Sequence, residues 1–135
     1  MEPVIVWYLR MSVVYFVVGT LIGFAMLLWP SESGYYIPVH VHLNLLGFMS
    51  MMIYGVGYHI LPKFSGTYIY SPRIMKIQFW MANAGLIGMS VSWPFVMRSD
   101  AALSETILIV SALLSIISVF LFTFNILKTI KAVSL

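Results

Sequence analysis

The chain contains no cysteine, and this absence excludes several kinds of chemistry. Disulfides, thiolate metal ligands, iron–sulfur clusters and covalent attachment of c-type haem all require cysteine. Charged residues are also scarce, at 8% of the chain, whereas hydrophobic residues make up 61%. Together with a mean hydropathy of +1.00, this composition excludes an ordinary soluble domain. Because no basic patch with interleaved aromatic residues is present, nothing indicates nucleic acid as a partner.

The apolar residues form long blocks separated by short connections. We therefore expect an all-α membrane protein with four transmembrane helices in a single domain over residues 1–135. The expected spans cover residues 4–29, 38–61, 72–97 and 101–127. Short connections make consecutive helices antiparallel neighbours. The N-terminus lacks a positively charged n-region and a small-residue cleavage site, so the first block should remain a helix.

Local signals suggest where these helices begin and end. Pro38 is tolerated in the first turn of the second helix, which should end before Pro62. Ser71 is a plausible N-cap of the third helix, and Pro94 should kink or fray its far end. Ser99 or Asp100 would cap the fourth helix.

The loop cations predict the orientation in the membrane. They gather around the second connection and after the fourth helix, as Lys63, Arg73, Lys76, Lys128 and Lys131. The first connection has no cation and the third has only Arg98. By the positive-inside rule, both termini should be cytoplasmic, in the inner membrane of a cell. His40 and His42 would then lie near the outer surface and His59 near the inner one.

Small residues recur at helix-packing intervals. Gly19 and Gly23 form a Gly-x-x-x-Gly pair on the first helix, and Ala84 with Gly88 repeats the spacing on the third. The fourth helix carries Ser111, with Ser115 one turn later. Such pairs allow the close approach of helices in membranes. We favour ordinary packing within one chain as their role.

Two of the three histidines, His40 and His42, are one residue apart inside an apolar block. On a helix this spacing places their imidazoles about 200° apart. The pair cannot bind one metal from within one chain, but it can present one ligand to each of two sites. Neutral imidazole is a good ligand for haem iron. The alternative is that each histidine only hydrogen-bonds headgroups or a neighbouring carbonyl.

The surrounding residues suggest how such a cofactor would be held. On a regular α-helix Gly47 falls below His40, where its missing side chain would let a flat macrocycle approach. Asn44 or a loop carbonyl could orient an imidazole through its second nitrogen. Arg98, with Trp93 as a second candidate, would bind anionic groups near the outer surface.

Other polar groups within the spans leave alternatives open. His59 lies 17 residues beyond His42, so it cannot ligate the same iron. It would belong to a quinone pocket, contribute to a proton path with Tyr54 and Tyr58, or cap the helix end. We expect Gln78 and Asn83 to form helix–helix hydrogen bonds, with a site role as the alternative.

The run from His40 to Gly47, continuing through Tyr58, His59 and Pro62, resembles the haem-binding helices of a known superfamily. This is the haem–copper oxidase and nitric oxide reductase catalytic subunit (subunit I) superfamily, particularly its short members. In that family twelve helices form three four-helix arcs, and one helix carries a His-x-His that points to two different haems. The resemblance implies that this chain corresponds to one arc and assembles as a homo-oligomer. A trimer is favoured over a twofold dimer, with haem b held between His40 of one chain and His42 of its neighbour.

The chain also departs from that family. The third and fourth spans contain no histidine, whereas the family's copper site needs three, so no copper is expected. Two histidines per haem would leave no coordination position for O₂ or nitric oxide. The resemblance therefore favours a b-type cytochrome of a respiratory chain that transfers electrons, with quinol or a redox protein as partner. The alternatives are a reduced oxidase or nitric oxide reductase-like enzyme whose haem site opens, and a haem-free accessory subunit. The predicted metal ligands are His40 and His42, and the predicted cofactor-binding residues also include Asn44, Gly47 and Arg98.

Overall fold

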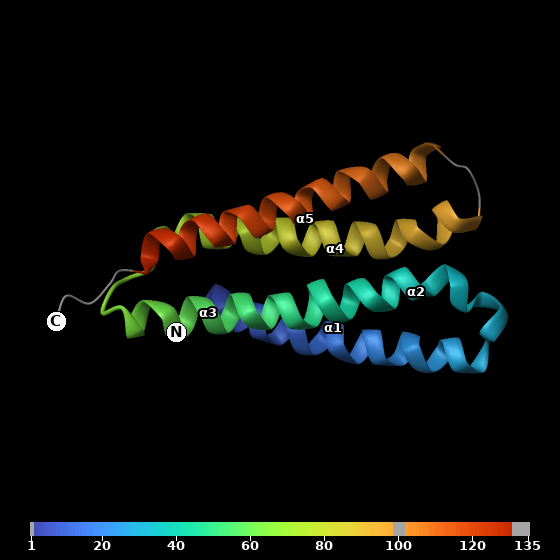
Figure 1. The fold of residues 1–135 in the computed structure, drawn as a ribbon, viewed down its shortest axis with the longest axis horizontal. Helices are drawn as coiled ribbons and strands as arrows, with labels where there is room; N and C mark the ends of the chain where they lie inside the picture. The colour runs from blue at the N-terminus through green and yellow to red at the C-terminus, as the bar shows by residue number, and fades with distance from the viewer. Residues whose placement is uncertain (1, 99–101, 131–135) are drawn as a thin grey trace.

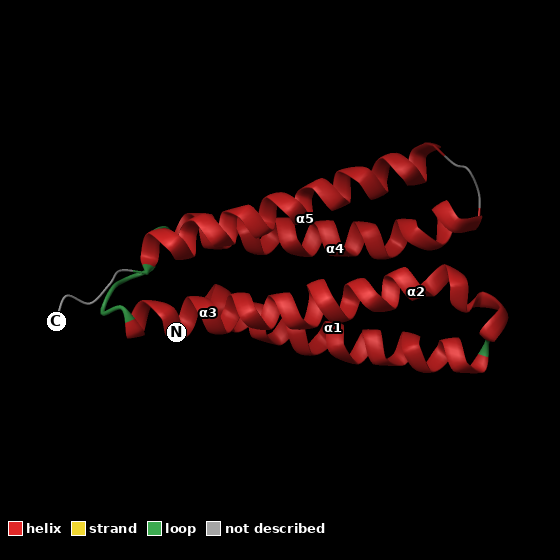
Figure 2. Ribbon diagram, in the orientation of Figure 1, coloured by secondary structure: helices red, strands yellow, loops and turns green. Residues whose placement is uncertain are grey.

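The computed structural model describes residues 2–98 and 102–130. The helices are α1 (Pro3–Leu28), α2 (Ser33–His42), α3 (Met51–Phe64), α4 (Pro72–Arg98) and α5 (Ala102–Thr129). A 3₁₀ turn, Pro30–Glu32, precedes α2, and a π-helical stretch, Leu43–Ser50, joins α2 to α3. Within the described ranges there is no strand (Figure 2). The prediction of an all-α protein is confirmed.

The helices form two hairpins that lie side by side (Figure 1). One hairpin pairs α1 with the long helix that contains α2 and α3, and the other pairs α4 with α5. The start of α1, the end of α5 and the α3–α4 connection lie at one end of the molecule, here called the termini end. The α1–α2 connection and the last turn of α4 lie at the opposite end, here called the histidine end.

The helix that contains the second expected span is longer than that span at both ends. The helix begins at Ser33 and continues to Phe64, with Pro38 and Pro62 inside it. A proline removes the one backbone hydrogen bond that its own nitrogen would donate. Both prolines lie within two turns of a helix end, so this loss does not end the helix. Helix α4 likewise continues through Pro94 to Arg98.

The N-cap of α4 is confirmed, because the Ile74 amide donates to Ser71 Oγ at 3.3 Å. The cap expected at Ser99 or Asp100 falls outside the described residues.

The π-helical stretch was not predicted, and it changes which residues face inward. Its wider turn is marked by Ser50 Oγ donating to the carbonyl of Leu45, five residues earlier, at 2.9 Å. The buried positions Val39, Leu43, Gly47 and Met51 follow one another every four residues. On a regular α-helix this spacing would drift by about 40° per step. The wider turn keeps these residues on the inward face.

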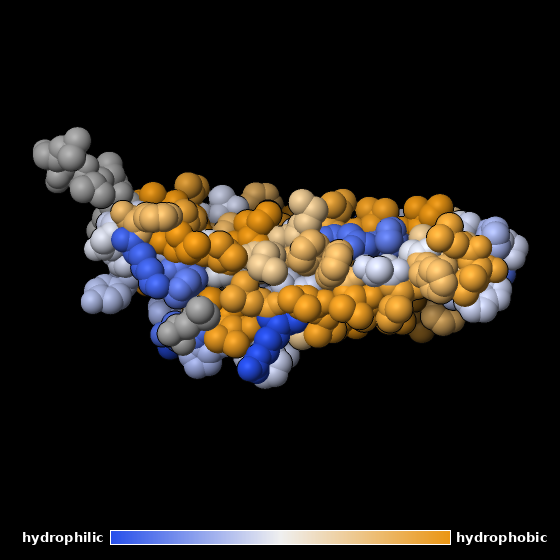
Figure 3. Space-filling view, turned by 90° about the horizontal axis from the view of Figure 1, so that it is seen from below, coloured by the Kyte–Doolittle hydropathy of each residue, from blue (hydrophilic) through white to orange (hydrophobic). Residues whose placement is uncertain are grey.

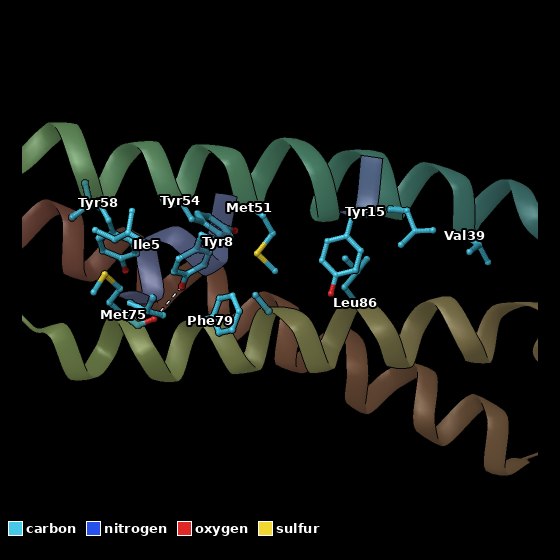
Figure 4. Close-up of a cluster of buried hydrophobic side chains, with 14 residues drawn as sticks. Ile5, Tyr8, Tyr15, Val39, Met51, Tyr54, Tyr58, Met75, Phe79 and Leu86 are labelled. Carbon is cyan, nitrogen blue, oxygen red and sulfur yellow. Dashed lines mark hydrogen bonds between the residues drawn. The ribbon is translucent and has the colours of Figure 1, made fainter. Parts of the chain in front are cut away.

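Polar bonds within the bundle join α1 to α4. Tyr8 OH donates to the Met75 carbonyl at 3.0 Å (Figure 4). It also donates to Gln78 Oε1. Tyr15 OH donates to Asn83 Oδ1 at 2.6 Å. The expectation that Gln78 and Asn83 form helix–helix hydrogen bonds is therefore confirmed. Tyr8 and Gln78 are both fully buried, where an unpaired polar group would be costly.

Close helix contacts rely on small residues, as expected, but not on all those predicted. A Cβ on Gly85 would lie 2.7 Å from the Ser111 carbonyl oxygen and 2.4 Å from Ser115 Oγ, so α4 and α5 touch at this point. Gly88 faces Ser111 in the same way. Ala84, by contrast, is exposed. The small face of α4 is therefore formed by Gly85 and Gly88, and not by Ala84.

The outer surface is that of a membrane protein. Three helices in the described part have the length and hydropathy of membrane spans: Pro3–Leu28, Pro30–Phe64 and Ala102–Thr129. Large apolar side chains such as Phe24, Leu27 and Phe120 are more than half exposed. Figure 3 shows a face that is apolar along most of its length. Helix α4 has 27 residues and is close in length to α1 and α5. It contains Gln78 and Asn83, which lower its hydropathy.

Candidate functional site

His40 packs directly on α1. A Cβ on Gly23 would lie 2.7 Å from His40 Cε1, so the glycine provides the space in which the ring lies. One turn earlier on α1, the Gly19 carbonyl lies 2.8 Å from His40 Nδ1. The Gly-x-x-x-Gly pair therefore has a specific role, since one glycine accommodates the imidazole and the other accepts its hydrogen bond.

His42 turns toward a different neighbour. Its ring centroid lies 6.3 Å from that of Trp93 on α4, with the planes inclined at 38°. Its Nδ1 lies 2.6 Å from the carbonyl of Pro38, four residues earlier on the same helix. His40 thus faces α1 and His42 faces α4, which is the divergence that their spacing predicts. Both rings are half-buried.

The two hydrogen bonds determine the tautomer of each neutral ring. A carbonyl oxygen can only accept, so Nδ1 carries the proton in each neutral imidazole. The lone pair then lies on Nε2, for which the described residues provide no hydrogen-bond partner. Metal-binding histidines characteristically donate one ring N–H to a carbonyl or carboxylate while the other nitrogen ligates. In this tautomer each Nε2 has a lone pair that can accept a hydrogen bond or bind a metal ion.

Asn44 and Gly47 have structural roles that differ from those expected. Asn44 Nδ2 donates to the His40 carbonyl at 2.8 Å, and the amide lies against Gly19. Its Nδ2 is 3.5 Å from His40 Nδ1, but both are donors, so Asn44 does not orient the ring. A Cβ on Gly47 would lie 2.7 Å from Tyr15 Cβ. The space expected for a macrocycle beside Gly47 is therefore filled by Tyr15.

Arg98 lies at the histidine end but contacts neither histidine in the described residues. It forms a salt bridge with Glu32, which ties the end of α4 to the connection between α1 and α2. Its guanidinium carbon lies 4.7 Å from the ring centroid of Tyr35 and 5.7 Å from that of Tyr36. Cation–π contacts of this kind hold an arginine in place.

A cavity of about 320 Å³ opens between the end of α1 and the start of α2. Its lining is mostly apolar and includes Ile22, Met26 and Trp29, with Glu32 at its polar edge. Ile22 precedes the glycine on which the ring of His40 lies. His40 is not among the residues that line the cavity, whose volume is of the size that small-molecule sites have.

The third histidine and the buried indole of Trp93 have different surroundings. His59 is at the opposite end of the long helix, where Lys63 Nζ donates to its Nε2 at 3.0 Å. Trp93 Nε1 is buried and has no hydrogen-bond partner among residues 2–98 and 102–130. No group of three or more histidine, cysteine or acidic side chains that could hold a metal occurs among the described residues.

Sequence reasoning missed the carbonyl of Gly19 and the packing of Tyr15. The glycine spacing on α1 was a signal for close approach, but nothing in it identified a histidine as the neighbour.

The fold and the surface define the class of this molecule: it is a helical, multi-pass membrane protein. The family model described as cytochrome c and quinol oxidase polypeptide I matches residues 2–98, which include α1 to α4 and both site histidines. Because the match covers well over half of the chain, the protein belongs to this family, within the haem–copper oxidase superfamily. No curated protein and no solved structure gives a significant match.

Proposed function

We propose that the protein is a membrane-embedded b-type cytochrome that transfers electrons through haem ligated by His40 and His42. The observation that carries this proposal is the hydrogen bond that the two rings have in common. Each imidazole donates its Nδ1–H to a backbone carbonyl. Each Nε2 then presents its lone pair, as haem iron requires. When bound, the haem supplies one-electron redox chemistry within the bilayer.

The polar groups around the rings fit such a cofactor. A buried indole N–H without a partner is costly, and that of Trp93 lies beside His42. An anionic haem propionate would accept this hydrogen bond. Arg98 lies at the same end of the bundle. Its guanidinium would release the Glu32 carboxylate and bind a second propionate instead.

The divergence of the rings supports ligation shared between chains. His40 and His42 lie against different helices of one chain, so each chain would contribute one axial ligand to each of two haems. Closed cyclic symmetry then gives equivalent haems between neighbours. We propose a homotrimer, with a dimer as the competing assembly, and no copper.

We further propose four membrane crossings, with both termini on the cytoplasmic side of the inner membrane. Helix α4 runs the length of the bundle between the end of α3 and the start of α5, which lie at opposite ends (Figure 1). The exposed cations Lys63, Arg73, Lys76 and Lys128 lie toward the termini end, in keeping with the positive-inside rule. Electrons would come from quinol or a redox protein.

A visible spectrum of the detergent-purified protein tests this proposal. A reduced-minus-oxidised difference with Soret and α bands is expected, together with an oligomer mass that includes haem. His40→Ala and His42→Ala should each abolish haem binding. His59→Ala is the matched control because it removes the third histidine at the other end, and it should retain full haem.

Several outcomes would contradict this proposal. A colourless wild-type protein would indicate a haem-free accessory subunit. A shift of the reduced spectrum on adding CO would indicate an open coordination position, as in an oxidase or nitric oxide reductase-like enzyme. Full haem in either single variant, or a monomer that retains haem, would refute shared ligation.

A further inference from the structure

The outward face of α3 carries an apolar groove that the haem proposal does not use. The groove has a volume of about 350 Å³ and is lined by Met52, Ile53, Val56, Gly57, Ile60 and Leu61. Ile53 and Val56 are exposed, so the groove opens outward from the bundle. In a membrane this surface meets acyl chains.

A lysine stands at the end of this groove. Lys63 lies three residues beyond Ile60 and seven beyond Val56, which places it on the same face of the helix as both. Its Nζ donates to His59 Nε2 at 3.0 Å, so the side chain turns back along α3. A lysine ammonium has three N–H donors, and two remain for an anionic oxygen.

The described residues at the same end of the molecule include several cations and form no salt bridge there. Arg73, Lys76 and Lys128 are exposed there, and the one salt bridge within the described ranges, Arg98–Glu32, lies at the opposite end. The segment after α3 is attached to the end of α5, because Thr67 Oγ1 donates to the Thr129 carbonyl at 2.9 Å. This attachment holds Lys63 and Lys128 at one end.

We infer that this groove binds one anionic phospholipid, with an acyl chain along Val56 and Ile60 and the phosphate at Lys63. An apolar trough ending at a partly satisfied ammonium matches an amphipathic anion. A zwitterionic lipid offers the same chains but no net charge. Inorganic phosphate offers the charge but no chain.

Native mass spectrometry of the detergent-purified protein with added lipid tests this inference. Phosphatidylglycerol should bind with a stoichiometry of one per chain, more tightly than phosphatidylcholine of the same chain length. Lys63→Gln should weaken phosphatidylglycerol binding about fivefold, the effect of one cation near a membrane surface. Lys76→Gln is the matched control, because it removes the same charge at the same end but from α4, and it should leave binding close to wild type. Val56→Trp, which fills the groove, should also weaken binding, and circular dichroism would check that each variant is folded.

Three results would overturn the inference. Equal losses in Lys63→Gln and Lys76→Gln would mean that a diffuse field attracts the lipid. Competition by inorganic phosphate at the same concentration as the lipid would mean a simple anion site. A chain-to-chain contact that Val56→Trp disrupts would mean that a second copy covers the groove. Each outcome is independent of haem, because the haem-free His40→Ala variant should bind the lipid as wild type does.

Discussion

Replacing Gly23 by alanine tests the contact that holds His40. The added Cβ would lie 2.7 Å from His40 Cε1, against 3.4 Å for an ordinary contact. The ring must therefore move away from α1 by about 0.7 Å, a distance taken from that difference. This displacement stretches the 2.8 Å hydrogen bond from Nδ1 to the Gly19 carbonyl toward the limit at which such a bond weakens.

The expected energies follow from these distances. Weakening one hydrogen bond inside a membrane bundle costs about 0.6 kcal/mol on average, and crowding a packed interface costs about 1–3 kcal/mol more. We therefore expect Gly23→Ala to lower the free energy of unfolding by about 1.6–3.6 kcal/mol. Because the Gly19 carbonyl orients the proposed ligand, haem affinity should fall by about 10–100-fold.

Unfolding in mixed detergent and SDS micelles, followed by circular dichroism, measures the first effect, and haem titration measures the second. Gly34→Ala is the control, since a Cβ at Gly34 meets no atom within 4 Å, and it should be neutral or slightly stabilising. Equal stability of the two variants would refute the placement of the His40 ring on α1.

Three further substitutions test the packing by the same unfolding assay. Tyr15→Phe leaves a buried amide oxygen on α4 without its 2.6 Å donor and should cost about 1 kcal/mol; unchanged stability would argue against that bond. Gly85→Leu forces α4 and α5 apart and should cost about 3 kcal/mol or more, whereas Ala84→Leu at an exposed neighbouring position should be nearly neutral; equal effects would contradict the assigned face. Arg98→Ala removes a salt bridge whose side chains are 43% and 47% exposed. It should lower the stability only slightly, and a large loss would show that the pairing with Glu32 is stronger than its exposure indicates.

The candidate site could be predicted only in part. The divergence of His40 and His42 follows from a two-residue spacing on one helix and needs no knowledge of other helices. The π-helical stretch changes the phase after His42, and the contact of Gly47 with Tyr15 on α1 could not be predicted from a regular helix. Arg98 was placed at the correct end, but its partner Glu32 comes from a distant connection.

What the sequence by itself determined is local or additive. Long apolar blocks predicted an all-helical membrane protein, because hydropathy sums along a segment regardless of its neighbours. The rotation of about 100° per residue along a helix predicted that the two imidazoles diverge, and this too depends on one segment only.

The tertiary structure alone decided how each ring is oriented and what covers it. The Gly19 carbonyl and the Trp93 indole come from other helices, so their positions depend on how closely the helices approach. That approach is governed by the complementary shapes of small and large side chains on different segments, a property that no single segment contains.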